Sequence, residues 1–351
     1  MNSSKAEKYG IMHAMNEQMH SPSPEEMPLV SVAVVSYRDF SGWERTLRSI
    51  LEQDYPRMEL VFQDDGSPEF AGYEPLIKDY LRENRRENLL SYTVVGLPEN
   101  VGTVENFNSA LAGCSGVYWR GFGLGDCFAD SHSLSRHVEL AVQSGAELVF
   151  GRVRAFSAED GRTVSVIPAP ERQAYMMALN SRELFDLMMS YRAVVSPGAL
   201  IQMDMFRELG GFDRRFRIVE DYHFWLRCFQ QGRRALFVND ILGAYEVSGQ
   251  INGTEPILSE ARIREAKLAF DLFNASEDHR YGPFQGLFNR LYLELHVNSA
   301  LRARRLALEN APAWKRRLCK LEQQLLKGVL RVCFPPVPGK PRLPRERLSD
   351  C

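Results

Sequence analysis

Three polar segments, each directly after an apolar run, carry the residues of this chain best suited to hold a ligand. They are Ser36–Asp39, Asp64–Ser67 and Gly123–Asp126. Asp, Gly and Ser also favour ordinary turns, so one such segment alone is consistent with a plain turn. In a parallel α/β sheet, however, ligands bind beyond the carboxyl ends of the strands. Three segments in order at such ends therefore predict one shared crevice.

The elements that must position these segments follow an alternating pattern. The run Leu29–Ser36 is short, β-branched and nearly continuously apolar, as in a strand buried on both faces. Trp43, Leu47, Ile50 and Leu51 then recur at helical spacing. The alternation predicts an α/β fold with a mostly parallel central sheet flanked by helices. Further strands are expected at 59–63, 90–95, 117–122 and 147–150, and further helices at 72–86, within 99–111, at 133–144, at 258–273 and at 284–331.

The composition is that of an ordinary globular protein. The chain has 351 residues, of which 44% are hydrophobic and 25% are charged. These values exclude a disordered chain, a collagen and a coiled-coil rod, and the length favours about two domains. No apolar run approaches the roughly 20 residues that span a bilayer, and the N-terminal segment lacks the apolar core of a secretory signal. The six cysteines form no CxxC pair, which favours reduced thiols in a cytoplasm over a zinc site.

Charge is distributed unevenly along the chain. The net charge is −2, but the segment from Arg302 to the end has 13 Lys/Arg against 4 Asp/Glu. Within 302–331, apolar residues at 314, 318, 321, 325 and 329 follow helical spacing, with cations between them. A basic amphipathic helix of this kind suits an anionic membrane surface. The alternative is a helix that packs on the rest of the chain with a solvated basic face. Nucleic-acid binding is not expected, because residues 1–301 are acidic.

Longer segments of the chain, taken in order, resemble one family of enzymes. The segments are Val32–Tyr37, Ser49–Pro56, Glu59–Ser67, Asn100–Gly102 with Asn106–Asn108, Leu209–Asp213 and Glu220–Arg227. Their order and spacing resemble those of the family 2 inverting glycosyltransferases with a GT-A fold, over about Pro28 to Asn252. The resemblance implies a nucleotide-sugar site in the N-terminal half, 29–130, and an acceptor site in 131–252.

The resemblance implies a role for the polar residues of the N-terminal half. Ser36 and Tyr37 would lie against the nucleotide base. Asp64 or Asp65, which the sequence does not distinguish, would accept the ring imide N–H of uracil or thymine. Turn and cap chemistry is the alternative role of the Asn and Gly residues that follow. The residues that would further line the nucleotide-sugar site are Asn100, Gly102, Asn108 and Asp126.

By the same resemblance, Glu220 and Asp221 are the catalytic pair. Inversion needs a base that removes the proton of the acceptor hydroxyl as its oxygen attacks the anomeric carbon. Asp221 matches that position, and Glu220 would orient it. Trp225 and Arg227 would form the acceptor-side wall. Alternatively, Asp221 caps the helix that runs through 222–230, because Asp is a preferred cap residue. The two roles are compatible.

The chain departs from the family pattern where a metal would bind. The family carries an acidic DxD-like motif whose carboxylate binds Mg²⁺ or Mn²⁺ at the diphosphate. Here Gly123 and Gly125 occupy the acidic positions, and only Asp126 remains as a metal ligand. In addition, Ser248 stands where the family often has a histidine. We therefore expect no strong dependence on Mg²⁺ or Mn²⁺.

This departure leaves several alternatives open. A metal could bind weakly through Asp126, or Arg38 or Arg120 could neutralise the diphosphate instead. The domain could also have lost catalysis and act as a nucleotide-sugar-binding scaffold subunit. A metal-dependent nucleotidyltransferase on a similar sheet is a further alternative, but no glycine- and base-rich phosphate loop occurs near the N-terminus.

The predicted organisation has four parts. A flexible extension (1–28) precedes the glycosyltransferase domain (29–252), which is followed by a basic, amphipathic helical region (253–333) and a Pro-rich basic tail (334–351). The predicted activity moves a sugar from a UDP- or dTDP-sugar to a hydroxyl of a glycan or lipid-linked acceptor. From the resemblance alone, the product is a bacterial surface polysaccharide or lipopolysaccharide. The predicted location is the cytoplasm, peripheral on the inner face of the cell membrane.

Overall fold

The computed structural model describes residues 25–190, 196–247 and 311–333, together with 261, 264–265, 268–269, 271–273 and 306. Most of the predicted extension and the whole predicted Pro-rich tail lie outside these residues. The described residues between 261 and 273 are helical, in agreement with the prediction for 258–273. Within the predicted helix 284–331, the structure describes residue 306 and α13 (Ala313–Cys333).

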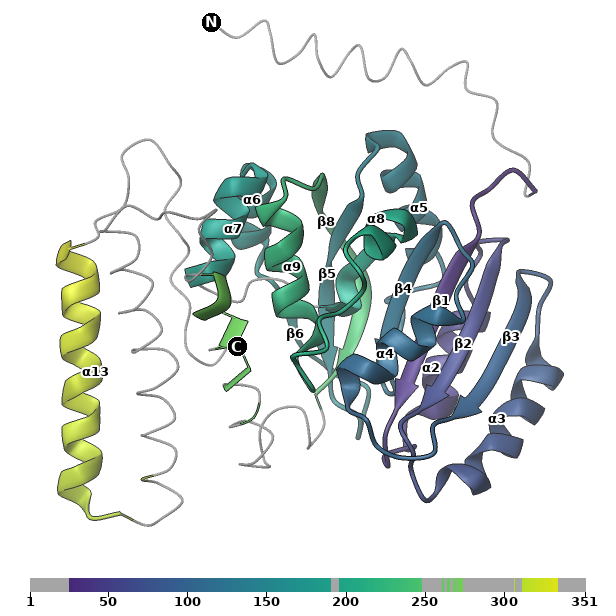
Figure 1. The fold of residues 1–351 in the computed structure, drawn as a ribbon, viewed down its shortest axis with the longest axis horizontal. Coiled ribbons are helices and arrows are strands. Elements are labelled where there is room, and N and C mark those ends of the chain that lie inside the picture. The colour runs from purple at the N-terminus through teal and green to yellow at the C-terminus, as the bar shows by residue number, and fades with distance from the viewer. Residues whose placement is uncertain are drawn as a thin grey trace, which may run out of the picture.

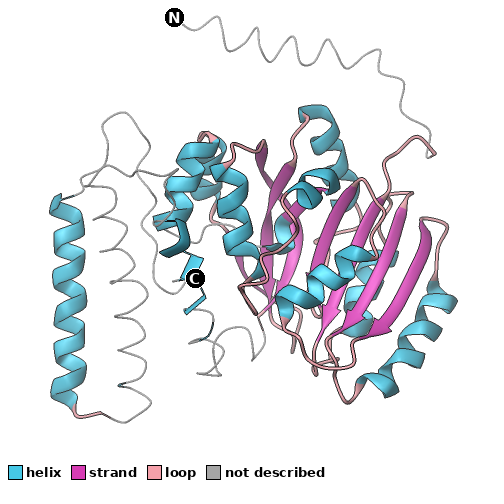
Figure 2. Cartoon of the chain, in the orientation of Figure 1, coloured by secondary structure: helices cyan, strands magenta, loops and turns pink. Residues whose placement is uncertain are grey.

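Eight strands of the described residues form one mixed sheet (Figures 1 and 2). The neighbours β3, β2, β1 and β4 are parallel. Strand β7 is antiparallel between β4 and β5, β6 is antiparallel to β5, and β8 pairs with β5 in parallel. The strands are β1 (Val30–Ser36), β2 (Met58–Asp64), β3 (Leu89–Gly96), β4 (Tyr118–Gly123), β5 (Leu148–Phe156), β6 (Thr163–Ile167), β7 (Ala199–Gln202) and β8 (Ala235–Glu246).

Helices pack on both faces of this sheet (Figure 2). On one face, α2, α3 and α5 share a hydrophobic core with Val32 of β1. On the other face, α4, α7, α8 and α9 share a core with Ala33, the next residue of the same strand. Because successive residues of β1 enter opposite cores, the strand is nearly continuously apolar. The helices are α2 (Trp43–Leu51), α3 (Phe70–Asn84), α4 (Thr103–Ala112), α5 (Ser133–Ser144), α6 (Pro170–Met177), α7 (Ser181–Ser190), α8 (Met203–Glu208) and α9 (Glu220–Gln230).

The sequence prediction agrees with these elements up to α5 and departs from them afterwards. Helix α5 has the predicted bounds, and β1 to β4 lie within two residues of theirs. Strand β5, however, continues to Phe156, six residues beyond the predicted end. Arg152 and Arg154 interrupt its apolar run, which is why the sequence pattern ends too early. Strands β6, β7 and β8 and helices α6 to α8 were not predicted.

The three polar segments singled out from the sequence lie at one edge of the sheet. Ser36, the last residue of β1, is in register with Asp64, the last residue of β2. On its other side, Val35 is in register with Gly123 at the end of β4. The carboxyl ends of β5 and β8 reach the same edge, because both run antiparallel to β7, which itself runs antiparallel to β4. Hence Glu246, the last residue of β8, lies at this edge as well.

Helix α13 stands apart from the sheet, at the opposite end of the view from β3 and α3 (Figure 1). Trp314, Leu318, Leu321 and Leu325 project from it with 55–71% of their surface exposed. Of the helices in the described part of the chain, none has the length and apolar composition needed to cross a membrane.

Candidate active site

Asp64 joins the turn after β2 to the end of β1. Its Oδ1 accepts hydrogen bonds from Ser36 Oγ at 2.8 Å and from Ser67 Oγ at 2.7 Å. Its Oδ2 accepts the backbone N–H of Ser67 at 2.6 Å. The carboxylate is fully buried. The structure thus brings Ser36 and Asp64 together. The hydrogen bonds from Ser67 to Asp64 stabilise the turn after β2.

Asp65 holds the next loop of the edge in the same way. Its carboxylate accepts the side-chain amide of Asn100 at 2.8 Å and the backbone N–H groups of Val101 and Gly102 at 2.7 and 3.0 Å. Burial raises the pKa of Asp65, although the two backbone N–H groups oppose that shift. Gly102 has a φ of 94°, and a Cβ there would lie 2.5 Å from Cγ of Arg217. The predicted residues 65, 100 and 102 therefore form one hydrogen-bonded unit.

Tyr37 and Arg38 form the rim next to this unit. The Tyr37 ring is 41% exposed, and the Arg38 guanidinium lies 5.1 Å from its centroid. Arg38 has a φ of 63°, and its backbone N–H donates to Ser67 Oγ at 2.7 Å. An exposed aromatic face beside a cation can stack on a nucleotide base and attract its phosphates.

Arg217 connects the donor-side loop to the segment that leads into α9. Its Nη1 donates to the carbonyl of Val101 at 3.0 Å and its Nη2 to the carbonyl of Asn100 at 3.1 Å. Its own carbonyl accepts the N–H of Val104 at 3.1 Å. Helix α9 begins three residues later, at Glu220. The loop that Asp65 holds and the predicted catalytic pair are thus joined through one residue.

Asp221 lies in the first turn of α9 and is 3% exposed. Ser196 Oγ donates to its Oδ2 at 3.2 Å. Ser196 begins the short helix η2 (Ser196–Gly198), which leads directly into β7 at the same edge of the sheet. The N-cap residue is Val219, not Asp221, but a carboxylate in the first turn still interacts favourably with the helix dipole.

Asp126 and Glu246 form a pair of carboxylates at the ends of β4 and β8. The backbone N–H of Glu246 donates to Asp126 Oδ1 at 3.3 Å. The Glu246 side chain is paired with Arg45 of α2. Burial raises the pKa of Asp126 to about 7, and the charge of Glu246 adds to this effect. A nearby cation would favour the ionised form of Asp126.

Asp126 is the described residue that could contribute a carboxylate to a divalent metal at this edge. The described residues contain no group of three His, Cys, Asp or Glu side chains that could hold a metal ion. Mg²⁺ at a nucleotide needs only one or two carboxylates in addition to phosphate oxygens. Asp126 offers one carboxylate, whereas Glu246 is already paired with Arg45. We therefore derive no reaction step through a metal.

Arg120 lies inside the protein, with its guanidinium bound to backbone carbonyls. Its side chain is fully buried, and its guanidinium donates to the carbonyls of Pro197, Ala199 (2.8 Å) and Leu242 (3.1 Å). Burial lowers its pKa to about 9. The role of Arg120 is thus to hold the segment that follows Ser196 against β8.

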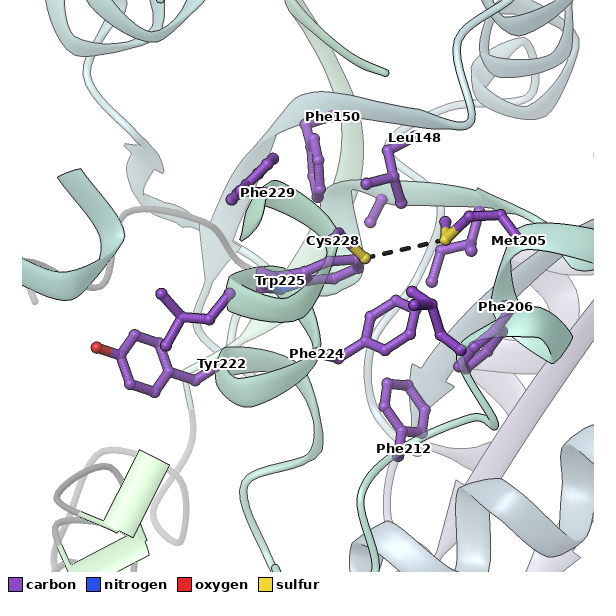
Figure 3. Packing of buried hydrophobic residues seen from close by; sticks show 14 of the residues in the cluster. Leu148, Phe150, Met205, Phe206, Phe212, Tyr222, Phe224, Trp225, Cys228 and Phe229 are labelled. Atoms are coloured by element: carbon purple, nitrogen blue, oxygen red, sulfur yellow. Dashed lines mark hydrogen bonds between the residues drawn. The ribbon is translucent and has the colours of Figure 1, made fainter. Parts of the chain in front are cut away.

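Three predicted site residues, Asn108, Trp225 and Arg227, contact other parts of the protein. Asn108 exchanges two hydrogen bonds of 2.9 Å with the backbone of Phe212. Trp225 is 1% exposed, and its ring contacts that of Phe150 edge to face at 4.9 Å (Figure 3). Arg227 donates to backbone carbonyls of the same turn, including that of Gly211 at 3.3 Å. Contacts of these three residues with donor or acceptor stay predictions.

Sequence reasoning missed Ser196, Arg217 and Glu246. Each contacts a predicted site residue that is distant in the sequence: Ser196 lies 25 residues from Asp221, Arg217 lies 117 from Asn100, and Glu246 lies 120 from Asp126. None belongs to a local motif. The tertiary fold brings them to the edge: Glu246 ends β8, Ser196 begins η2, and Arg217 lies in the segment before α9.

Comparison with protein families identifies this arrangement. The model of glycosyl transferase family 2 matches residues 31–210, about half of the chain. The chain belongs to this family. It is therefore an enzyme of the glycosyltransferase class, in agreement with the resemblance found in the sequence. The match ends before α9, so it does not itself assign a role to Glu220 or Asp221.

Two curated relatives are glycosyltransferases by name. The chain is 28% identical over 229 residues to TuaG of Bacillus subtilis, named as a teichuronic acid biosynthesis glycosyltransferase, and the match covers 63% of this chain and 79% of TuaG. It is 21% identical over 249 residues to an uncharacterized glycosyltransferase of Haemophilus influenzae, covering 70% of this chain and 88% of that protein.

Two solved structures share the fold. A mannosyltransferase of Pyrobaculum calidifontis, solved with GDP-Man and Mn²⁺, aligns with a TM-score of 0.55 at 18% identity over 92% of this chain and 87% of its own. TarS of S. aureus, solved with UDP-GlcNAc, aligns with a TM-score of 0.54 at 15% identity over 87% of this chain and 92% of its own. These likenesses confirm the predicted GT-A fold class.

Proposed function

We propose that this enzyme transfers a sugar, with inversion at the anomeric carbon, from a UDP- or dTDP-sugar to a hydroxyl of a growing bacterial surface polysaccharide or lipopolysaccharide. The observation that carries the proposal is the single edge that gathers Ser36, Asp64 and Asp65 and, through Arg217 and Ser196, the first turn of α9. The names of TuaG and of the TarS complex support a cell-wall glycan and a uridine nucleotide. A GDP-sugar, as in the mannosyltransferase, is the alternative donor.

The donor would bind at the rim of Tyr37 and Arg38. Its base would stack near Tyr37, and its ring imide N–H would donate to the carboxylate of Asp64 or Asp65. Each carboxylate already accepts three hydrogen bonds and has about four lone-pair sites, so one site is left for the base. The guanidinium of Arg38 would face the diphosphate.

Asp221 would act as the general base. The acceptor oxygen would attack the anomeric carbon from the face opposite the nucleotide. As it does so, the proton of the acceptor hydroxyl would pass to a carboxylate oxygen of Asp221. The bond from the anomeric carbon to the diphosphate breaks, and the nucleoside diphosphate leaves with that electron pair. Ser196 Oγ, which donates to Oδ2 of Asp221, would keep the other carboxylate oxygen turned toward the acceptor.

Asp221→Asn tests this assignment. A general base contributes about 10²- to 10⁴-fold, so we expect transfer to fall at least 100-fold while the affinity for UDP changes less than about threefold. Transfer is measured by nucleoside diphosphate release, and the product is checked by NMR for the inverted anomer.

The same assay with EDTA in place of Mn²⁺ is expected to change the rate by less than about tenfold.

Asp204→Asn is the matched control, because Asp204 is also a first-turn carboxylate but lies in α8 and is exposed. It should transfer sugar like the unmodified enzyme. Retained transfer in Asp221→Asn would exclude Asp221 as the base. If no pair of nucleotide sugar and glycan acceptor turns over while UDP still binds, the proposed activity is wrong.

The acceptor would be presented at the inner face of the cell membrane, where α13 would bind. Trp314, Leu318, Leu321 and Leu325 form an exposed apolar stripe along this helix. Cations adjoin the stripe, and Lys315 lies 5.7 Å from the Trp314 ring centroid. The charge and the apolar stripe together complement an anionic lipid surface, where each cation contributes about 1 kcal/mol.

A further inference from the structure

The N-terminus of α9 is held by a carboxylate from a segment of the chain that follows β8. Glu265 Oε1 accepts the backbone N–H of Arg217 at 2.9 Å. Its Oε2 accepts the N–H groups of Ile218 and Val219 at 2.9 and 2.8 Å. Three consecutive amides directly before the helix therefore converge on one side chain.

These amides have no local partner of their own. The N-cap residue, Val219, has no side-chain oxygen and makes no cap hydrogen bond, and it is buried. The first amides of a helix and of the turn before it need an acceptor when they are removed from water. Glu265 supplies that acceptor from 46 to 48 residues away, and its negative charge also suits the positive end of the helix dipole.

A second contact ties the same segment to α9. The Phe273 ring lies 5.1 Å from the ring of His223 on α9 and 5.5 Å from that of Phe185 on α7. Ala269 and Phe273 are buried in the core that α9 shares with the sheet. The segment is thus anchored on α9, which fixes where the Glu265 carboxylate lies.

We infer that Glu265 is a positioning residue for the transfer reaction. The amides that it binds belong to the residues between the donor-side loop, which Arg217 contacts, and the first turn of α9, which carries Asp221. Loss of the carboxylate would release this segment and let Asp221 move relative to the acceptor hydroxyl. A shift of about 1 Å at a reacting group costs about 100-fold in rate. This inference rests on the proposed role of Asp221.

The experiment compares Glu265→Ala and Glu265→Gln with Glu147→Gln in the full chain. Glu147 is a matched control, because it accepts the N–H of Arg234 at 2.9 Å and the side chain of Arg233 at 3.1 Å beyond the opposite end of α9. We expect Glu265→Ala to lower kcat at least tenfold with KM for the donor within threefold, because Asp65 holds the donor loop independently. Glu265→Gln keeps one acceptor oxygen, so its kcat should lie between those of Glu265→Ala and the unmodified enzyme. Glu147→Gln should keep kcat and KM within twofold of the unmodified values.

Hydrogen exchange gives a readout that does not depend on activity. The amides of 217–219 should exchange at least tenfold faster in Glu265→Ala than in the unmodified enzyme. Their exchange rates should be unchanged in Glu147→Gln. Unchanged exchange at 217–219, or a kcat of Glu265→Ala equal to that of Glu147→Gln, would overturn the inference. If the unmodified enzyme transfers no sugar, the proposed function fails, and the exchange rates still decide whether Glu265 holds the segment.

Discussion

Asp64 and Asp65 are neighbours in sequence that stabilise different parts of the site. Asp64 binds back to β1 through Ser36, whereas Asp65 binds forward to the loop at Asn100–Gly102. The sequence alone could not separate them, because both are acidic residues in the same turn. The structure shows that several donors hold each carboxylate in a fixed orientation. A nucleotide base that bound to either would therefore meet an acceptor that is already oriented.

His223 is a buried histidine next to the predicted base. Its ring packs between those of Phe216, at 4.6 Å, and Phe273, at 5.1 Å. Burial lowers its pKa to about 4, although the Asp213 carboxylate 3.6 Å away opposes the shift and Arg227 adds to it. The neutral imidazole is therefore the form that fits the fold.

This pKa predicts a loss of stability in acid. Because the pKa of His223 in the folded state lies below its ordinary value of 6.5, the unfolded chain binds the proton first as the pH falls. The contribution of His223 to the free energy of unfolding is complete above pH 6.5. It is lost as the pH falls toward 4, which lowers that free energy by up to about 3 kcal/mol. His223→Phe keeps a ring of similar size and should remove this part of the pH dependence. Urea unfolding of both proteins at pH 4.5 and 7.5 measures the difference, and an equal pH dependence would contradict the assignment.

At the scale of elements, the contact between β8 and η2 positions Ser196. Gly243 of β8 lies so close to η2 that a Cβ would be 1.8 Å from the Pro197 carbonyl oxygen and 3.0 Å from Arg120 Nη2. Any side chain at this position must push η2 away from β8. The Ser196 hydroxyl, which donates to Asp221, would move with it.

Gly243→Ala should therefore destabilise the fold by about 1–3 kcal/mol and reduce sugar transfer. Gly72→Ala is a matched control, because Gly72 lies in α3 with no atom within 4 Å of an added Cβ. Replacing a helical glycine by alanine should stabilise by about 0.5–1 kcal/mol without changing transfer. Thermal unfolding and the transfer assay test both variants. A Gly243→Ala protein as stable as the unmodified enzyme would show that η2 and β8 adjust freely.

The elements that the sequence predicts are those with local patterns. Helix α5 could be located because its apolar positions repeat at helical spacing, and β1 because it is buried on both faces. Strand β7 has only four residues, and Asn239 and Asp240 interrupt the apolar run of β8, so neither shows a long, continuous strand pattern. The acceptor-side role of Trp225 was predicted from the family resemblance. The sequence shows that it lies on a helix but not that this face of α9 packs against Phe150.

At the scale of the whole molecule, the basic helix is the feature that would join catalysis to a membrane. Burying one leucine contributes roughly 1.5–3 kcal/mol, whereas adding one acidic charge near the surface costs about 1 kcal/mol. Leu321→Glu should therefore weaken binding to vesicles that contain anionic lipid about tenfold or more. Gln324→Glu adds the same charge at an exposed position beside the stripe. It should weaken binding to these vesicles less than about tenfold.

Co-sedimentation with anionic and with neutral vesicles measures these affinities. Stronger binding to anionic vesicles is expected of the unmodified enzyme. Absence of binding to either kind of vesicle, or equal effects of the two substitutions, would exclude the membrane role of the stripe. Self-association in light scattering that Leu321→Glu abolishes would instead assign the stripe to a second copy of the chain.

The position of Glu265 also limits how such an enzyme can be recombined. The family match ends at residue 210, yet the helix that carries Asp221 takes its acceptor for three amides from residue 265. A chimera with its crossover after residue 210 would keep the donor half intact, but it must take α9 and the 261–273 segment from the same parent. An exchange of residues 217–230 alone would place Glu265 opposite the amides of another parent's segment, so this segment and residue 265 should be exchanged together.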